Sequence, residues 1–276
     1  MKKEYMHFII TRFNIPTKYA GRKNTSMDNV DPKTNEKYLD YRMNLFDRYT
    51  FPSLKNQTNK NFKWLVLFSN QTPQKYKKRL QLFAEEFTNF CPLYLTDEEA
   101  YNFDIYLESV LNQYDCDTYI TTRIDNDDAI SINMIEEIQK YYKQECNENL
   151  LLSFTYGLQY TEKTKRFATQ NIKGNHFITM ILTNPSKTVI SFPHNKIPKE
   201  ITTVTMGEKK KPMWIEVIHE NNYANQTFFN IKNAVKSSKI IDDFMCDISW
   251  NQLDVIKNII ISIPDTFKCI YQLIKK

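Results

Sequence analysis

The sequence predicts an α/β fold in which a mostly parallel sheet is flanked by helices. Two observations predict it. Short apolar runs with the length of buried strands recur in the first half of the chain, at residues 7–11, 62–68, 93–95 and 117–124. Segments with helical spacing of apolar residues separate these runs, and strands joined by single helices form parallel sheets that are covered on both faces.

The segments that connect these strands are predicted to be helices. Residues 38–51 place aromatic and aliphatic side chains at helical spacing, and we expect Pro52 to end this helix. Residues 73–87 begin with a proline, which suits a first helical turn, and carry one apolar face. A third helix is expected at residues 102–114.

The second half of the chain shows a less regular pattern. A helix is expected at residues 132–144, followed by strands within 150–161 and 164–172 that are compatible with a hairpin. Residues 171–212 are polar and carry no pattern that assigns a structure. A further strand is expected within residues 212–220.

No repeat or linker divides the chain, so we predict one domain at residues 1–230 and a C-terminal helical extension at 231–276. The extension is expected to be helical from about residue 240, with a break at Pro264. Its apolar stretch has lysines at both ends. Such a segment either packs on the domain or an oligomer partner, or contacts a membrane surface peripherally.

Composition excludes several classes of protein. The net charge of +5 is mild, and no compact basic run interleaved with aromatic residues suggests nucleic-acid binding. Only 4 glycines are present, and no glycine-rich phosphate-binding motif occurs. The 5 cysteines are scattered, which is typical of a reduced, cytoplasmic protein. We find no secretion signal and no stretch long enough to span a bilayer.

The stretch TTRIDNDDAI at residues 121–130 places three carboxylates directly after a predicted strand. In parallel α/β sheets, ligands bind beyond such strand ends. A helix cap would use only one or two of these acids, and an EF-hand is excluded because Ile130 stands where glycine is required. A hard-cation site remains the stronger interpretation, because carboxylates suit Mg²⁺ or Mn²⁺ and Arg123 could bind a diphosphate beside them.

Four segments in order carry a resemblance to a known family. They are TRFN (11–14), YTFPSLKNQTNKNFKWLVLF (49–68), TTRIDNDDAI (121–130) and WIEVIHENN (214–222). Together they resemble the putative rhamnosyltransferase family of bacteria and, more broadly, nucleotide-sugar glycosyltransferases with the GT-A fold, a Rossmann-like sheet flanked by helices. The run RIDNDDAI resembles the D-x-D element of those enzymes.

The resemblance implies transfer of a sugar from a nucleotide-diphosphate donor to a hydroxyl of a bacterial surface glycan, which can be lipid-linked. It also implies a Mn²⁺ or Mg²⁺ ion that bridges the donor phosphates. Rhamnose is the sugar that the family name indicates, and other sugars stay open. Two alternatives remain: a metal-dependent nucleotidyltransferase and a non-catalytic glycan-binding domain of the same fold.

The resemblance also implies roles for individual residues. The expected metal ligands are Asp127 first, then Asp125 and His219. The expected donor-binding residues lie at three strand ends: Thr11, Arg12, Asn14, Ser69, Asn70, Arg123 and Asp125. Ser69 and Asn70 stand where related enzymes carry an acid that faces the base. An inverting enzyme needs a carboxylate base, and Glu216 and Asp128 are the candidates.

Overall fold

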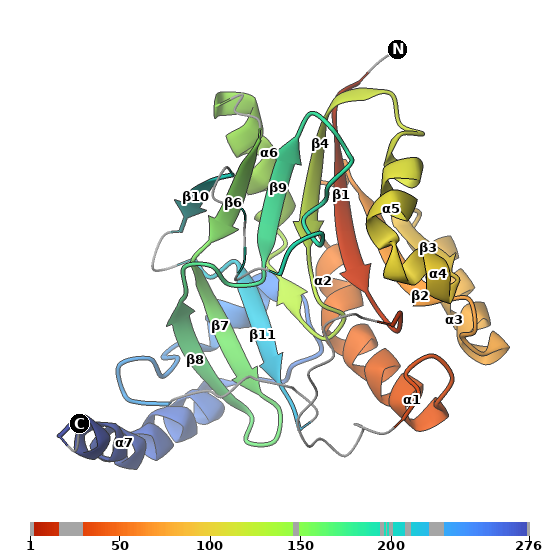
Figure 1. Ribbon diagram of the computed structural model, residues 1–276. Coiled ribbons are helices and arrows are strands. Elements are labelled where there is room, and N and C mark those ends of the chain that lie inside the picture. The colour runs from red at the N-terminus through yellow and green to blue at the C-terminus, as the bar shows by residue number, and fades with distance from the viewer. Residues whose placement is uncertain are drawn as a thin grey trace.

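The structure is a computed structural model that describes residues 3–16, 30–145, 149–193, 196, 198, 201–207, 211–220 and 229–274. The chain forms a seven-stranded sheet, drawn in the upper part of Figure 1, and a four-stranded sheet below it. Helices cover the larger sheet, and the C-terminal segment lies beside the smaller one (Figure 1).

The large sheet has the strand order β10-β6-β9-β4-β1-β2-β3. Its strands are β1 (Lys3–Arg12), β2 (Lys63–Ser69), β3 (Phe90–Leu95), β4 (Cys116–Arg123), β6 (Leu150–Phe154), β9 (Ile178–Leu182) and β10 (Thr202–Met206). Strands β3, β2, β1 and β4 run parallel, and β10 runs parallel to β6. Only β9 is antiparallel to its neighbours within this sheet. The predicted mostly parallel α/β sheet is confirmed.

The helices alternate with these strands. They are α1 (Glu36–Leu45), α2 (Phe51–Lys55), α3 (Gln74–Glu86), α4 (Asp97–Tyr101), α5 (Phe103–Leu111) and α6 (Met134–Glu145). A π-helical turn, η1 (Phe46–Thr50), joins α1 to α2. The predicted helix end at Pro52 is therefore wrong. Pro52 stands in the first turn of α2, where a residue without a backbone N–H is tolerated.

Alternation along the strands divides the core into two layers. On β1, Ile9 joins an aromatic layer with Phe46 and Trp64, whereas Phe8 joins the opposite layer with Leu107. Side chains of α1, α3 and α6 pack into the first layer, and those of α4 and α5 pack into the second. The sheet is thus covered on both faces, and its strand ends are left to carry polar residues.

The small sheet has the order β5-β11-β7-β8. Its strands are β5 (Ala129–Ile130), β7 (Tyr156–Thr161), β8 (Arg166–Asn171) and β11 (Trp214–Ile218). Strands β7 and β8 form the expected hairpin. Strand β5 follows the acid run and pairs with β11, so the small sheet brings β11, which lies in the WIEVIHENN segment, next to that run.

The C-terminal segment contains a 3₁₀ helix, η2 (Ser238–Phe244), and the long helix α7 (Gln252–Ile274). The predicted break at Pro264 is wrong, because α7 continues through it. Pro264 lies on the exposed side, where water can satisfy the carbonyl that it leaves free. Asn258 donates to the Phe167 carbonyl at 2.9 Å, and Asp265 pairs with Arg166 at 3.0 Å.

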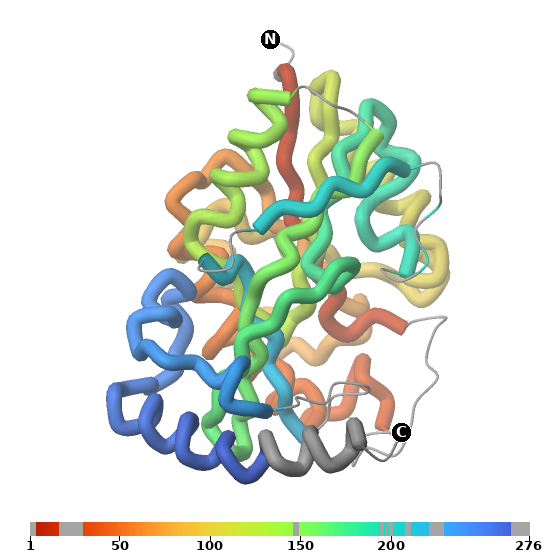
Figure 2. The backbone as a smooth tube through the Cα atoms, turned by 90° about the vertical axis from the view of Figure 1, so that its left-hand side faces the viewer, coloured from red at the N-terminus to blue at the C-terminus, as the bar shows by residue number. Residues whose placement is uncertain are grey.

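Figure 2 shows α7 crossing the lower end of the molecule. No helix within the described residues has the length and apolar character needed to cross a membrane.

Candidate functional site

The acid run lies where the carboxyl ends of β1 and β4 meet. The Asp128 N–H donates to the Asp125 carbonyl at 3.4 Å, which closes a tight turn after β4. The side chain of Asn126 donates to the carbonyls of Arg12 and Phe13 at 3.1 and 3.0 Å. These bonds tie the turn to the end of β1, so the three carboxylates are held in fixed positions.

Asp125 is paired with the arginine that precedes it. The Arg123 guanidinium donates to both carboxylate oxygens, from Nε at 3.1 Å and from Nη2 at 2.9 Å. Burial by itself would raise the pKa of Asp125, but the charge of Arg123, helped by His176, lowers that pKa well below its usual range. Asp125 is therefore a carboxylate at any physiological pH.

Asp127 is paired with groups from two distant elements. Its Oδ2 atom accepts from Arg42 of α1 at 3.0 Å and lies 2.9 Å from Nε2 of His219, which follows β11. Burial raises the pKa of Asp127, but Arg42 and His219 outweigh it and lower that pKa. Among the described residues, the second oxygen, Oδ1, has no hydrogen-bond partner.

Asp128 has a different environment. Its Oδ2 atom lies 2.8 Å from Nε2 of His176, and its Oδ1 atom accepts from the Val217 N–H at 2.9 Å. Burial, together with the charge of Asp127, raises the pKa of Asp128 to about 7. Burial disfavours the charged form of His176, but the bond to Asp128 outweighs it and raises the pKa of His176 to about 9. This pair can hold a proton near neutral pH.

Glu216 of β11 faces the same region. One of its carboxylate oxygens accepts from Gln159 of β7 at 2.5 Å, and the other lies 4.0 Å from Nδ1 of His176. The side chain is buried. Both residues expected as bases, Asp128 and Glu216, therefore flank one imidazole.

His176 is the site residue that sequence reasoning missed. It lies between β8 and β9, in the segment without an assignable pattern, and a lone histidine without a spacing motif gives no signal there. Among the described residues, Asp125, Asp128 and His176 form a group whose ligand atoms all lie within 4.8 Å of one another. These oxygen and nitrogen donors could hold a divalent cation.

The other expected donor-binding residues lie at the ends of β1 and β2. The Thr11 hydroxyl is buried and accepts from Nε1 of Trp64 at 3.0 Å. Asn14 is also buried, donates to Thr72 at 3.0 Å and accepts from the Ser69 N–H at 3.1 Å. Through these bonds the side chains of Thr11 and Asn14 hold the ends of β1 and β2 together. Asn70 is exposed, and its backbone carbonyl accepts from Lys77.

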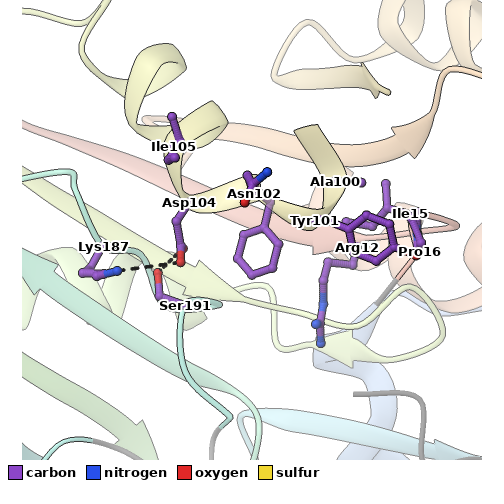
Figure 3. A pocket seen from close by; sticks show the side chains of 11 residues that line it. Arg12, Ile15, Pro16, Ala100, Tyr101, Asn102, Asp104, Ile105, Lys187 and Ser191 are labelled. Atoms are coloured by element: carbon purple, nitrogen blue, oxygen red, sulfur yellow. Dashed lines mark hydrogen bonds and ion pairs between the residues drawn. The ribbon is translucent and has the colours of Figure 1, made fainter. Parts of the chain in front are cut away.

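Arg12 lies at the edge of a cavity of about 260 Å³ between the end of β1 and the helices α4 and α5. Figure 3 shows Lys187 at one side of this cavity and Arg12 with Tyr101 at the other, with Asn102 between them. Lys187 lies 3.9 Å from Asp104, which also accepts from Ser191. Burial and the charge of Arg123 lower the pKa of Arg12, and the charge of Asp125 opposes them. We call this space the Arg12 cavity.

A second, larger hollow of about 510 Å³ adjoins the acid run at His219. Its wall includes Tyr41 of α1, Glu162 after β7, and Ile218 of β11. The Tyr41 ring packs edge-on against the His219 ring, with centroids 5.5 Å apart. We call this space the Tyr41 hollow.

A comparison with protein families matches residues 6–231 to the family described as "Putative rhamnosyl transferase". The match covers most of the chain. The chain belongs to this family. The resemblance read from the four sequence segments is thereby confirmed.

Solved structures of S. aureus TarS are similar to this transferase in fold. TarS 1–349 shares 10% identity over 77% of this chain and 60% of its own, with a TM-score of 0.40. A longer TarS structure shares 11% identity over 77% of this chain and 37% of its own, with a TM-score of 0.42. TarS 1–349 in complex with UDP-GlcNAc shares 10% identity over 94% of this chain and 70% of its own, with a TM-score of 0.42.

This chain thus spans less than two thirds of the length of the first TarS structures that it matches. A search among curated proteins found no significant match.

Proposed function

We propose that this transferase moves a sugar from a nucleotide-diphosphate donor to a hydroxyl of a glycan, with a divalent cation bound at the acid run. One observation carries the proposal. Three carboxylates share one turn after β4, and each is held by a cationic or imidazole side chain from elsewhere in the fold. A helix cap would need neither the three acids nor their partners.

Asp127 and His219 are the proposed metal ligands. Nε2 of His219 lies 2.9 Å from Oδ2 of Asp127, so the two side chains are close enough to bind one ion. Oδ1 of Asp127 has no partner among the described residues, whereas Arg123 occupies both oxygens of Asp125. Asp125 would then support the ion or bind the donor ribose. The alternative ligand set is the Asp125, Asp128 and His176 group.

When bound, Mn²⁺ or Mg²⁺ would neutralise the negative charge that grows on the departing nucleoside diphosphate. The donor is proposed to occupy the Arg12 cavity. Two cations, Arg12 and Lys187, line it against one carboxylate, Asp104, and Arg123 lies beyond Arg12 at the acid run. Guanidinium and ammonium groups stabilise phosphate oxygens through charge-assisted hydrogen bonds.

Asp128 is the preferred catalytic base. A general base works best when its pKa is close to the working pH, and burial and the charge of Asp127 raise the pKa of Asp128 to about 7. Glu216 remains the second choice, since it lies near the same imidazole. A carboxylate base that takes the proton of an attacking hydroxyl is what an inverting transferase requires.

The family description supports rhamnose as the transferred sugar, and we propose a bacterial surface glycan as the acceptor. We keep residues 1–230 as the catalytic domain and 231–276 as an extension. Phe244, Trp250 and Val255 of the extension pack against the small sheet. Exposed isoleucines on α7, such as Ile256 and Ile260, support peripheral contact with a membrane that carries a lipid-linked acceptor.

The test is release of nucleoside diphosphate by slow donor hydrolysis. The purified protein is incubated with a panel of nucleotide sugars and MnCl₂, with and without EDTA, and Asp127→Asn serves as the control. We expect release from one donor, abolished by EDTA and reduced about 1,000-fold or more in the variant, because the variant loses ligand charge at the ion. Release that is insensitive to EDTA, or no metal-dependent donor binding by calorimetry, would contradict the proposal.

A further inference from the structure

The Tyr41 hollow has a wall chemistry that differs from that of the Arg12 cavity. Its charged lining residues are two carboxylates, Glu162 and Glu220, against one ammonium group, Lys163, with His219 at the boundary. The Arg12 cavity has the opposite balance, with two cations and one carboxylate. On the charge of the lining residues alone, an anionic nucleotide diphosphate fits the Arg12 cavity better than the Tyr41 hollow.

We infer that the Tyr41 hollow binds the sugar of the acceptor glycan that is to be extended. The inference rests on the proposed function, since it names the second substrate's place at the same centre. A sugar presents apolar C–H faces and many hydroxyls. The Tyr41 ring and Ile218 offer apolar contact, and carboxylates such as Glu162 accept strong hydrogen bonds from hydroxyls.

The position of the hollow supports this assignment. The acid run lies between the two spaces: Arg12, at the edge of its cavity, interacts electrostatically with Asp125, and His219, at the edge of the hollow, contacts Asp127. A transfer reaction must bring two substrates together at one centre. Each of the two spaces is lined by a residue that interacts with the acid run, Arg12 in one case and His219 in the other, which fits that requirement.

Two hydrogen bonds fix the side chain of Glu162 at the wall of the hollow. Its Oε1 atom accepts from Arg48 at 2.8 Å and from the Tyr49 hydroxyl at 2.6 Å, and these bonds leave Oε2 without a partner among the described residues. The hydroxyl of the neighbouring Thr161 also has no hydrogen-bond partner among the residues that the structure describes. A fixed carboxylate can therefore accept from a sugar hydroxyl at little entropic cost.

The transfer step balances with these parts. The acceptor hydroxyl oxygen forms a bond to the anomeric carbon of the donor sugar, and the bond from that carbon to the diphosphate oxygen breaks. The electron pair of that bond leaves with the nucleoside diphosphate. The hydroxyl proton passes to the carboxylate of Asp128, which follows Asp127 in the acid run.

The test compares two tyrosines, one in each space. Tyr41→Ala removes the ring of the hollow, and Tyr101→Ala removes a partly exposed ring from the Arg12 cavity. Binding of a panel of p-nitrophenyl glycosides to the full-length protein is measured by saturation-transfer NMR, in the presence of diamagnetic MgCl₂ and UDP. Binding of nucleotide sugars and of Mn²⁺ is measured by calorimetry on the same variants.

We expect Tyr41→Ala to weaken glycoside binding about tenfold or more and to leave nucleotide-sugar and Mn²⁺ affinity within about threefold. Tyr41→Phe, which keeps the ring, should bind glycosides like the unmodified protein. Tyr101→Ala should show the reverse pattern. Unchanged glycoside binding in Tyr41→Ala, or no glycoside binding to the unmodified protein, would overturn the inference. Failure of the proposed function would show separately, as absent metal-dependent donor hydrolysis in the unmodified protein.

Discussion

Two histidines, one buried inside the large sheet and one half-buried near its strand ends, have opposite pKa shifts. His7, in the middle of β1, is fully buried, and its ring contacts the Thr122 hydroxyl at 2.8 Å and the Gln139 amide at 3.3 Å. Burial among these neutral groups lowers the pKa of His7 to about 3. His176, near the strand ends, contacts the Asp128 carboxylate, and its pKa is raised to about 9.

The comparison shows that the partners of the histidines change from neutral groups inside the sheet to a carboxylate at the strand ends. The partner of His7, Thr122, lies inside strand β4. The partner of His176, Asp128, lies six positions later, beyond the end of that strand. Inside the sheet, a neutral hydrogen-bond network satisfies a buried imidazole without any charge. At the strand end, a carboxylate stabilises the imidazolium form. Of these two histidines, only His176, at the edge that carries the acid run, has a pKa raised by a carboxylate.

The larger expected effect concerns His7. Between pH 6.5 and about 3, the unfolded chain binds a proton on this histidine that the folded protein does not. The free energy of unfolding should therefore fall as the pH falls, by up to about 1.4 kcal/mol per pH unit from this group. His7→Gln should flatten this slope, measured as urea unfolding at a series of pH values below 6.5. An unchanged slope would show that His7 is protonated in the folded state.

The smaller expected effect concerns His176. Its folded-state pKa of about 9 lies above the unfolded value of about 6.5, so its stabilisation is present below pH 6.5 and is lost as the pH rises to about 9. In EDTA, His176→Gln should remove this decline, which is at most about 3 kcal/mol for a group with these two pKa values. Equal declines in the variant and the unmodified protein would mean that Asp128 does not hold a charged His176.

The parallel half of the fold could be predicted because each strand is a continuous apolar run, as in residues 62–68, between helices with one apolar face. The small sheet could not be predicted in full. Strand β5 has two residues and exists only because it pairs with β11, about 85 positions away in sequence. Strand β10 is a half-exposed edge strand without an apolar run. Such strands depend on tertiary pairing rather than on local pattern.

In the candidate site, too, some residues could be found from local sequence and others could not. The acid run was visible because three carboxylates after a buried strand are unusual, and His219 was found through the family resemblance. Arg42 and His176 could not be found, because each is a single residue brought to the acids by the fold. Thr11 illustrates the converse, since a polar residue at a strand end can be taken up by the core, here by Trp64.

The most direct test of the account is Mn²⁺ binding, measured by electron paramagnetic resonance in the presence of the active donor nucleotide. Asp127 and His219 are the proposed ligands of the ion. Asp127→Asn and His219→Gln should therefore weaken Mn²⁺ affinity about 10- to 100-fold or more, while His176→Gln should keep affinity within about threefold. Loss in His176→Gln with retention in His219→Gln would place the ion on the Asp125, Asp128 and His176 group instead. No Mn²⁺ binding by the unmodified protein would contradict a metal-dependent transferase altogether.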